Sequence, residues 1–353
     1  MKRLDRYIAE QLWQAVLLVV VVLSGIQVFM ELLRHLNDIG VGSYGLAAVF
    51  VTVIFQLPLD IYQLFPMAGF LGCLLGLGRL ASHSELIAMR AGAFSIGQIL
   101  GAVLKAAALL IILVTLMGET LAPWLQGESE HLRQIAMSRA FGESKQGIWL
   151  REGKNFIYLD TVHGEQANDI TFFQVEPTGA MGLAAHAATA THPEKRLWVL
   201  HEGETTHFQN AYLTLTHFAQ HPLPLLYDPR LEQEGKRAAD DLSVTKLYES
   251  IQYRVGAKLN ASRLTVAFWQ RIMQPLTTLV MIALGVPFIF GSLRNASTGL
   301  RLLVGIVVGF GFYILNQCLG PLAIVLQFPP VLAAIFPTLL FTVGCGILLR
   351  RQW

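Results

Sequence analysis

The chain has 353 residues, of which 54% are hydrophobic and only 14% are charged. Soluble globular chains carry about 25% charged residues, so this composition excludes most soluble classes of protein. A net charge of only +2, with Lys and Arg dispersed along the chain, argues against a nucleic-acid binder.

Apolar runs long enough to cross about 30 Å of hydrocarbon recur along the chain, so we expect a membrane protein. The first run follows a basic N-terminus but exceeds a signal-peptide core and has no cleavage site after it, which predicts a retained span. Pro58 and Pro66 interrupt the second run, which could form one span or two. The runs cover residues 15–30, 46–80, 101–122, 272–290, 302–326 and 331–349.

The distribution of Lys and Arg decides how many times the chain crosses the membrane. If 46–80 is one span, nearly all basic residues near span ends fall on one side, and the short loops of the other side hold only Arg34. The positive-inside rule then favours six spans with both termini in the cytoplasm. The basic residues collected on the cytoplasmic side are Lys2, Arg3, Arg6, Arg79, Arg90, Arg294, Arg301, Arg350 and Arg351.

Residues 82–95, between the second and third spans, have the pattern of a short amphipathic helix. Ser84 is a candidate N-cap, and Leu86, Met89, Arg90 and Phe94 share roughly one face. Such a helix either lies on the membrane surface or docks onto a cytoplasmic partner, and the first outcome is the more common on physical grounds.

A hydrophilic block between the third and fourth spans would face the side opposite the cytoplasm. Alternating stretches rich in β-branched and aromatic residues occur in it at 148–151, 155–159, 170–175, 197–201 and 211–216, separated by turn residues. This pattern predicts an all-β sandwich or jelly roll, joined to the spans by helical connectors at about 124–143 and 240–263. We therefore expect three regions: 1–123, 124–265 and 266–353.

The sequence lacks the usual signatures of nucleotide binding and hydrolysis. It has no phosphate-binding P-loop, no Gly-x-Ser-x-Gly elbow and no His-Glu-x-x-His helix. Histidines are frequent in the β block, but they form no His-x-His pair, so we interpret them as surface residues and expect no metal site. The three cysteines, each inside an apolar run, predict no disulfide.

Polar side chains inside the apolar runs are costly and therefore informative. Glu31, Arg34 and Asp60 lie within or beside the first two runs, and Asn316 and Gln317 lie in the fifth. Interhelical hydrogen bonding alone would explain Asn316 and Gln317, and an interfacial ion pair would explain Glu31 and Arg34.

Short motifs spread in order along the whole chain add a family resemblance. They are Leu4-Asp-Arg-Tyr-Ile8, Phe65-Pro-Met-Ala68, Leu74-Leu-Gly-Leu-Gly78, Ser84-Glu-Leu86, Gln146-Gly-Ile-Trp149, Asn155-Phe-Ile-Tyr158, Gln274-Pro-Leu276, Phe288-Ile-Phe-Gly291, Gly320-Pro-Leu322 and Pro329-Pro330. Together they resemble the lipopolysaccharide export permease family, LptF/LptG, and its LptG branch more than its LptF branch. That family's layout is three spans, a periplasmic jelly roll and three more spans, which agrees with the arrangement expected from the residues.

The resemblance implies a permease subunit of an ATP-binding-cassette transporter rather than an enzyme. Such a subunit lies in the inner membrane of a Gram-negative bacterium and works with an LptF-type permease, an LptB-type cytoplasmic ATPase dimer and an LptC-type bitopic subunit. Lipopolysaccharide would leave the inner membrane and pass to a periplasmic bridge protein. ATP and Mg would be bound by the ATPase, so the resemblance implies no cofactor in this chain.

The resemblance also assigns roles to particular residues. It makes 82–95 the coupling helix that the ATPase holds, with Ser84 at its start, Glu85 and Arg90 as polar contacts, and Leu86 and Met89 as apolar anchors. Spans one and five would form lateral gates for the lipid.

Basic residues near the outer mouth would contact the phosphates of the lipid, because Arg donates paired hydrogen bonds to phosphate. Arg34, His35 and Arg133 are the main candidates, and Arg139 is a further one. The resemblance implies an Asp-Gln pair at positions 316–317, whereas this chain has Asn316 before Gln317. The missing carboxylate weakens a charge-based role at that position. Glycines and prolines in 58–78 would serve either hinging or close helix packing.

Three alternatives remain at the level of sequence. One is the LptF-type paralogue, which shares the architecture. Another is a lipoprotein-release or macrolide-type export subunit, although its extracytoplasmic domain normally follows the first span. The third is a membrane-anchored enzyme with its active site in the β block, which the absence of a convergent acid, base or nucleophile motif disfavours.

Overall fold

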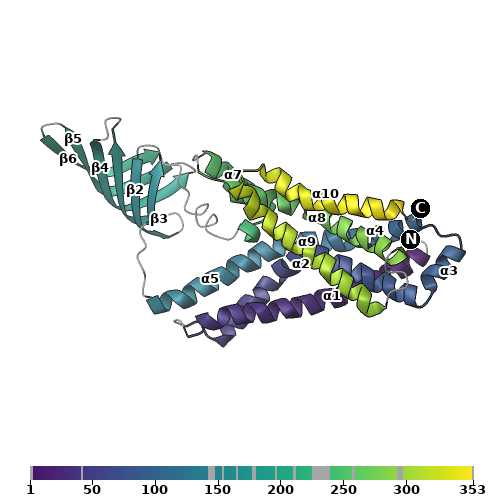
Figure 1. Cartoon of the computed structure of the whole chain (residues 1–353). Helices are drawn as coiled ribbons and strands as arrows, with labels where there is room; N and C mark the ends of the chain where they lie inside the picture. The colour runs from purple at the N-terminus through teal and green to yellow at the C-terminus, as the bar shows by residue number, and fades with distance from the viewer. Residues whose placement is uncertain are drawn as a thin grey trace. The chain divides into compact units, whose positions relative to one another are not determined.

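The chain forms two compact units in the computed structural model (Figure 1). The first comprises Met1–Ala140, Ala239–Tyr248 and Ala261–Trp353, and the second comprises Phe141–Ala238 and Glu249–Asn260. The boundary expected at 123/124 lies instead at 140/141, because the helix that follows the third span continues it within the first unit. The structure describes residues 3–40, 43–141, 148–152, 155–163, 166–176, 180–194, 197–209, 212–224, 239–256, 259–291 and 297–351.

Six helices in the described part of the first unit are long and apolar enough to cross a membrane, as the sequence predicted. The interrupted run 46–80 forms one continuous helix, so the single-span interpretation is confirmed. The six are α1 (Arg3–His35), α2 (Leu46–Ser82), α4 (Ile96–Leu116), α8 (Ser262–Phe290), α9 (Thr298–Val325) and α10 (Pro330–Arg350). Lys2 and Arg294, counted above for orientation, lie outside the described residues.

Glycines let α2 approach its neighbours closely. A Cβ at Gly72 would lie 2.7 Å from the Cα of Val16 on α1, and one at Gly69 would lie 2.7 Å from Cγ1 of Ile282 on α8. Real Cβ atoms do not approach other atoms so closely, so these positions require the absence of a side chain. Close packing therefore accounts for these glycines, and α2 remains helical through Pro58 and Pro66.

The segment between α2 and α4 contains a short helix, α3 (Glu85–Ala91). The expectation that Ser84 caps it is wrong: Ser84 has a φ of 62° and its side chain makes no capping hydrogen bond. Instead Ser95 caps α4, through a capping box in which Ser95 and Gln98 satisfy each other's backbone N–H groups. Phe94 lies beyond the end of α3.

A π segment, η2 (Met117–Leu121), joins α4 to α5 (Ala122–Phe141) without interrupting the helical rod. The backbone N–H of Ala122 donates to the carbonyl of Met117, five residues earlier, as a π-helix requires. Helix α5 and the later α7 (Val244–Gly256) confirm the two predicted helical connectors. Two short 3-10 turns complete the described helical elements, η1 (Leu36–Asp38) and η3 (Ala239–Asp241).

The second unit contains a six-stranded antiparallel sheet in which each strand pairs with the next along the chain. The strands are β1 (Ile148–Glu152), β2 (Asn155–His163), β3 (Gln166–Val175), β4 (Met181–Glu194), β5 (Leu197–Gln209) and β6 (Tyr212–Pro224). The all-β expectation is confirmed. Its connectivity is simpler than predicted, because the described strands form one meander without the Greek-key crossovers of a jelly roll.

Strand β4 escaped prediction because alanine, which dominates it, has a low strand propensity. Its small residues nevertheless suit the core of the sheet: Ala185 faces Phe172 and Ala187 faces Ile170 across the β3–β4 ladder, and all four are buried. The larger buried side chain of Trp198 on β5 belongs to the same core.

Candidate functional site

Polar side chains meet where α1 ends and α5 passes. The guanidinium of Arg34 donates to Glu31 at 2.6 Å, and the guanidinium of Arg133 donates to Asp38 at 2.9 Å. His35, nearly buried, lies between the two carboxylates, 3.9 Å from Glu31 and 3.5 Å from Asp38. The structure thus brings three of the predicted substrate-binding residues together, confirms the expected ion pair of Arg34 with Glu31, and adds Asp38, which was not predicted there.

Exposure differs sharply among the three basic groups. The side chain of Arg34 is 70% exposed, whereas that of Arg133 is 35% exposed and that of His35 only 11%. Arg34 is therefore the group most available to an external anion, while Arg133 donates to Asp38 and His35 lies beside that carboxylate. Arg139 lies in α5, but its side chain is outside the described part of the chain.

Helix α3 presents a different surface from the one expected. Leu86 is only 3% exposed and packs in this chain's own core, and Met89 packs against that core as well. Leu86 was therefore wrongly assigned as an anchor for a partner; Ile87, 56% exposed, is the apolar side chain that α3 offers outward. Glu85 accepts a hydrogen bond from the Tyr7 hydroxyl of α1 at 2.8 Å, so α3 is tied to the first span.

The remaining predicted polar groups inside the spans form separate contacts. Asp60, nearly buried, accepts a 3.5 Å hydrogen bond from the Gln27 side chain, which links α2 to α1. The backbone carbonyl of Asn316 accepts from the Gln270 side chain at 3.1 Å, and the Gln317 amide donates within α9. Interhelical hydrogen bonding by the Asn316 and Gln317 side chains therefore stays a prediction, because the bond at Asn316 uses its backbone and the bond of Gln317 lies within α9.

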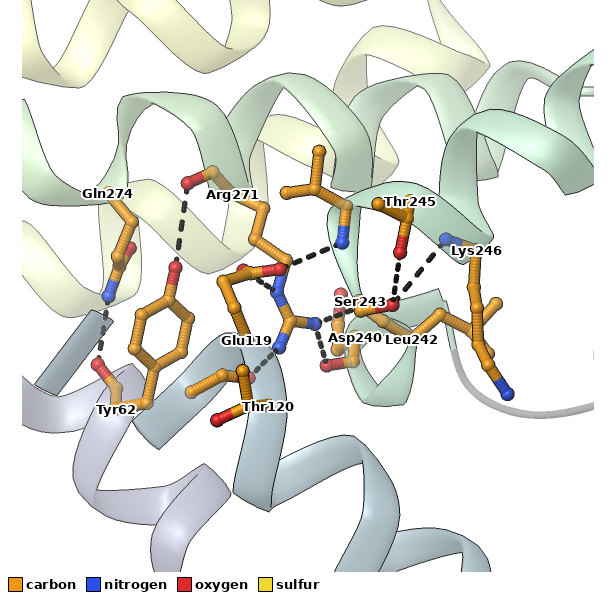
Figure 2. Close-up of polar contacts among 12 residues, drawn as sticks. Tyr62, Glu119, Thr120, Asp240, Leu242, Ser243, Thr245, Lys246, Arg271 and Gln274 are labelled. Atoms are coloured by element: carbon orange, nitrogen blue, oxygen red, sulfur yellow. Dashed lines mark hydrogen bonds and ion pairs between the residues drawn. The ribbon is translucent and has the colours of Figure 1, made fainter. Parts of the chain in front are cut away.

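Among the described residues, the most extensive polar network centres on Arg271 of α8 (Figure 2). Arg271 is only 7% exposed. Its Nε donates to Glu119 at 2.6 Å, and its Nη2 donates to the carbonyl of Gly118 at 2.7 Å. Its Nη1 donates to the carbonyls of Asp240, at 3.0 Å, and Leu242. One guanidinium thus joins α8, the π segment η2, the turn η3 and the residue that follows it.

Other groups complete the network around this guanidinium. The second carboxylate oxygen of Glu119 accepts from the backbone N–H of Val244 at 2.9 Å, at the start of α7. The Tyr62 ring lies 5.3 Å from the guanidinium carbon of Arg271, within cation–π range. A Cβ on Gly118 would overlap this ring, so only glycine fits there. Figure 2 shows Glu119 and the Tyr62 ring to the left of the Arg271 guanidinium, with Asp240 and Leu242 to its right.

The Arg271 network was not predicted from the sequence. Glu119 lies inside the third apolar run, and Arg271 directly precedes the fourth run. The available signal was the presence of opposite charges at corresponding ends of two consecutive apolar runs, since such charges pair to avoid desolvation. Which carbonyls Arg271 would reach depended on the π segment, which periodicity does not reveal.

A cleft of about 390 Å³ lies between α8, α9 and η3. Gln270 and Gln317 bring amide groups to it, and Val266, Pro321 and Ile324 bring apolar surface. Such a mixture suits an amphipathic molecule, with hydrogen bonds at one part and hydrocarbon at another. Within the described ranges, no three His, Cys, Asp or Glu side chains lie close enough to hold a metal ion.

Comparison with known proteins identifies a family over almost the whole chain. Residues 6–351 match the family described as lipopolysaccharide export system permease LptF/LptG. The chain is 31% identical to the lipopolysaccharide export system permease protein LptG of Escherichia coli strain K12, over 99% of this chain and 98% of that protein. It is also 31% identical to the protein of the same name from Haemophilus influenzae, with the same shares covered.

Proposed function

The chain belongs to the LptF/LptG family of lipopolysaccharide export permeases, and from this we propose that it is the LptG-type subunit of a transporter that extracts lipopolysaccharide from the inner membrane. The observation that carries the proposal is a family match spanning residues 6–351 of a multi-pass membrane chain, whose β unit is inserted between the third and fourth spans. The two relatives named above, both called LptG, favour that branch over the LptF-type alternative.

The proposed subunit works in a complex. An LptF-type permease would face it in the membrane, an LptB-type ATPase dimer would bind ATP and Mg on the cytoplasmic side, and an LptC-type subunit would lead to the periplasmic bridge protein. Both termini would be cytoplasmic and the β unit periplasmic, since basic residues gather at the ends of the spans on the side of α3.

The first experiment is purification of the tagged chain under mild detergent, with mass analysis of the proteins and glycolipid that accompany it. We expect an ATPase, a six-span paralogue and lipopolysaccharide. A chain recovered alone, with neither ATPase nor glycolipid, contradicts the proposal and favours a membrane-anchored β module. An ATPase without glycolipid, together with a different exported lipid, favours another export system.

We assign α3 as the helix that docks on the ATPase, using its outward side. Ile87 and Arg90 are exposed, and Glu85 is half-buried at the start of the helix. Replacing Ile87 by Asp places a charge where we expect an apolar contact, so it should sharply lower the amount of ATPase that co-purifies.

Glu85 needs a separate control because it also binds Tyr7. Glu85→Ala removes both the internal hydrogen bond and any contact with the ATPase, whereas Tyr7→Phe removes only the internal bond. We expect Glu85→Ala to reduce recovery of the ATPase and Tyr7→Phe to preserve it. Equal loss in both variants means that Glu85 serves the fold of α3 rather than docking.

Arg34 is the residue we assign to the phosphates of the lipid, because its guanidinium is the most exposed of the cluster at the end of α1. A matched control lies on the same helix: Arg6 pairs with Glu10 at 3.1 Å and is 80% exposed. Arg34→Gln should lower stimulation of the ATPase by lipopolysaccharide, while Arg6→Gln should not. Unchanged stimulation in Arg34→Gln removes Arg34 from the site.

A further inference from the structure

The backbone of the π segment leaves one carbonyl without a helical donor. Ala122 donates its N–H to Met117, and residue 123, which would donate to Gly118 in π geometry, is a proline without an N–H. In an α-helix the same proline would instead leave the carbonyl of Glu119 unpaired. Pro123 therefore costs one backbone hydrogen bond in either geometry, and an outside donor can decide between them.

Arg271 supplies that donor to Gly118 and not to the carbonyl of Glu119. Its Nη2 lies 2.7 Å from the Gly118 oxygen, while its Nε holds the Glu119 side chain at 2.6 Å. Both interactions depend on the π geometry, because an α turn would rotate Gly118 and Glu119 relative to α8. The guanidinium thus stabilises the π form over the α form.

A π turn holds one residue more than the α turn it replaces, so it changes the register of everything that follows. Relative to a continuous α-helix, each residue of α5 is rotated by about 100° and displaced by about 1.5 Å along the axis. The consequence falls on Arg133 and Ala136, which lie downstream in α5.

Contacts between α5 and the loop after α1 depend on this register. Arg133 reaches Asp38 at 2.9 Å, and the carbonyl of Ala136 accepts from the backbone N–H of Ser43 at 3.0 Å. Ala136 also packs against the buried cluster that contains Tyr44 and Val49. A rotation by one residue would replace Ala136 by Ile135 and turn Arg133 away from Asp38.

From these contacts we infer that Arg271 is a positioning residue: by holding η2 in π geometry it sets the rotation of α5 and so directs Arg133 toward Asp38. Arg271 is itself unsuited to contact substrate, because it is buried and its donors reach Glu119 and three carbonyls. The inference rests on the proposed function in one respect only. The proposed function gives the polar cluster at the end of α1, which includes Arg34 and Arg133, its role toward lipid phosphate.

Cysteine crosslinking in the full chain measures the register directly and does not depend on transport. Ser43→Cys with Ala136→Cys reports the present register, because their backbones are in hydrogen-bond contact. Ser43→Cys with Ile135→Cys reports the register shifted by one residue. Cys318, the exposed native cysteine among the described residues, is replaced by Ser; Cys73 and Cys345 are buried.

We expect the 43/136 pair to crosslink in the Arg271 chain and the 43/135 pair to crosslink poorly. In Arg271→Met, the rate for 43/136 should fall by about tenfold, a change within reach of losing the charged hydrogen bond to the Gly118 carbonyl, and the rate for 43/135 should rise. Arg263→Met, which removes an exposed charge from the same helix, should change neither rate.

Two outcomes separate positioning from simple loss of structure. General destabilisation would lower both crosslinks, whereas a change of register moves the crosslink from 136 to 135. Deleting Thr120 from the π segment of Arg271→Met removes the extra residue, so an α turn then restores the original register and the 43/136 crosslink. The inference is overturned if Arg271→Met keeps the 43/136 crosslink, loses both crosslinks, or is not rescued by the deletion.

Discussion

Replacing Gly72 by Ala tests whether close packing of α1 on α2 holds the membrane unit together. A methyl group at Gly72 would lie 2.7 Å from the Cα of Val16 and 2.9 Å from its backbone nitrogen. Because these atoms belong to the backbone of α1, a change of rotamer cannot relieve the overlap, and α1 must move away from α2.

The magnitude follows from two opposing effects. Overpacking a well-packed site costs about 1–3 kcal/mol, and a backbone contact belongs at the upper end of that range. Alanine in place of glycine within a helix returns up to about 1 kcal/mol. We therefore expect Gly72→Ala to destabilise the chain by about 1–2 kcal/mol.

Gly101 on α4 provides the matched control, because a Cβ built there has no atom within 4 Å. Gly101→Ala should be neutral or slightly stabilising. The assay is thermal unfolding of both purified variants in the same detergent. Unfolding is monitored as loss of the monodisperse peak in size-exclusion chromatography. If Gly72→Ala is as stable as Gly101→Ala, then α1 does not pack against Gly72 of α2 as closely as these distances indicate.

Further substitutions test three other contacts. Trp198→Ala should cost about 3–5 kcal/mol and open the β unit to limited proteolysis, because Trp198 is 1% exposed in its core. Glu119→Ala should cost about 3–5 kcal/mol by leaving the buried charge of Arg271 without its carboxylate, and the double variant with Arg271→Met should be more stable than Glu119→Ala alone in the same thermal assay. Thr338→Val should cost about 1 kcal/mol, through loss of the 2.6 Å hydrogen bond between Thr338 and Thr277, whereas the exposed Thr216→Val should change the melting temperature little.

The spans and their number could be predicted because bilayer thickness and charge asymmetry act on long stretches of sequence. The single helix through Pro58 and Pro66 followed from the positions of Arg79 and Arg90, although local propensity alone would have divided it. Local propensity also misled for strand β4, which was not predicted. Its alanines are small enough for the core of the sheet but have a low strand propensity.

The candidate sites could be predicted only where sequence neighbours form them. Arg34 and His35 follow Glu31 by one turn of α1, so their clustering was accessible from helical spacing. Leu86 shows the limit of this approach, because an amphipathic pattern cannot tell whether the apolar face meets this chain or another one. In the structure, the side chain of Leu86 packs in the chain's own core, whereas the side chain of Ile87 is exposed.

The distribution of burial among the spans bears on which helices could separate. Half of the most apolar stretch of α8 is buried within the chain, against 17% of the corresponding stretches of α1 and α9. A helix held on many sides is costly to move, whereas α1 and α9 expose apolar faces that lipid or a second permease can cover equally well. This difference is consistent with the expectation, drawn from the family resemblance, that spans one and five form lateral gates. It also places the Arg271 network on the most buried of these spans, where a positioning residue has a well-packed base.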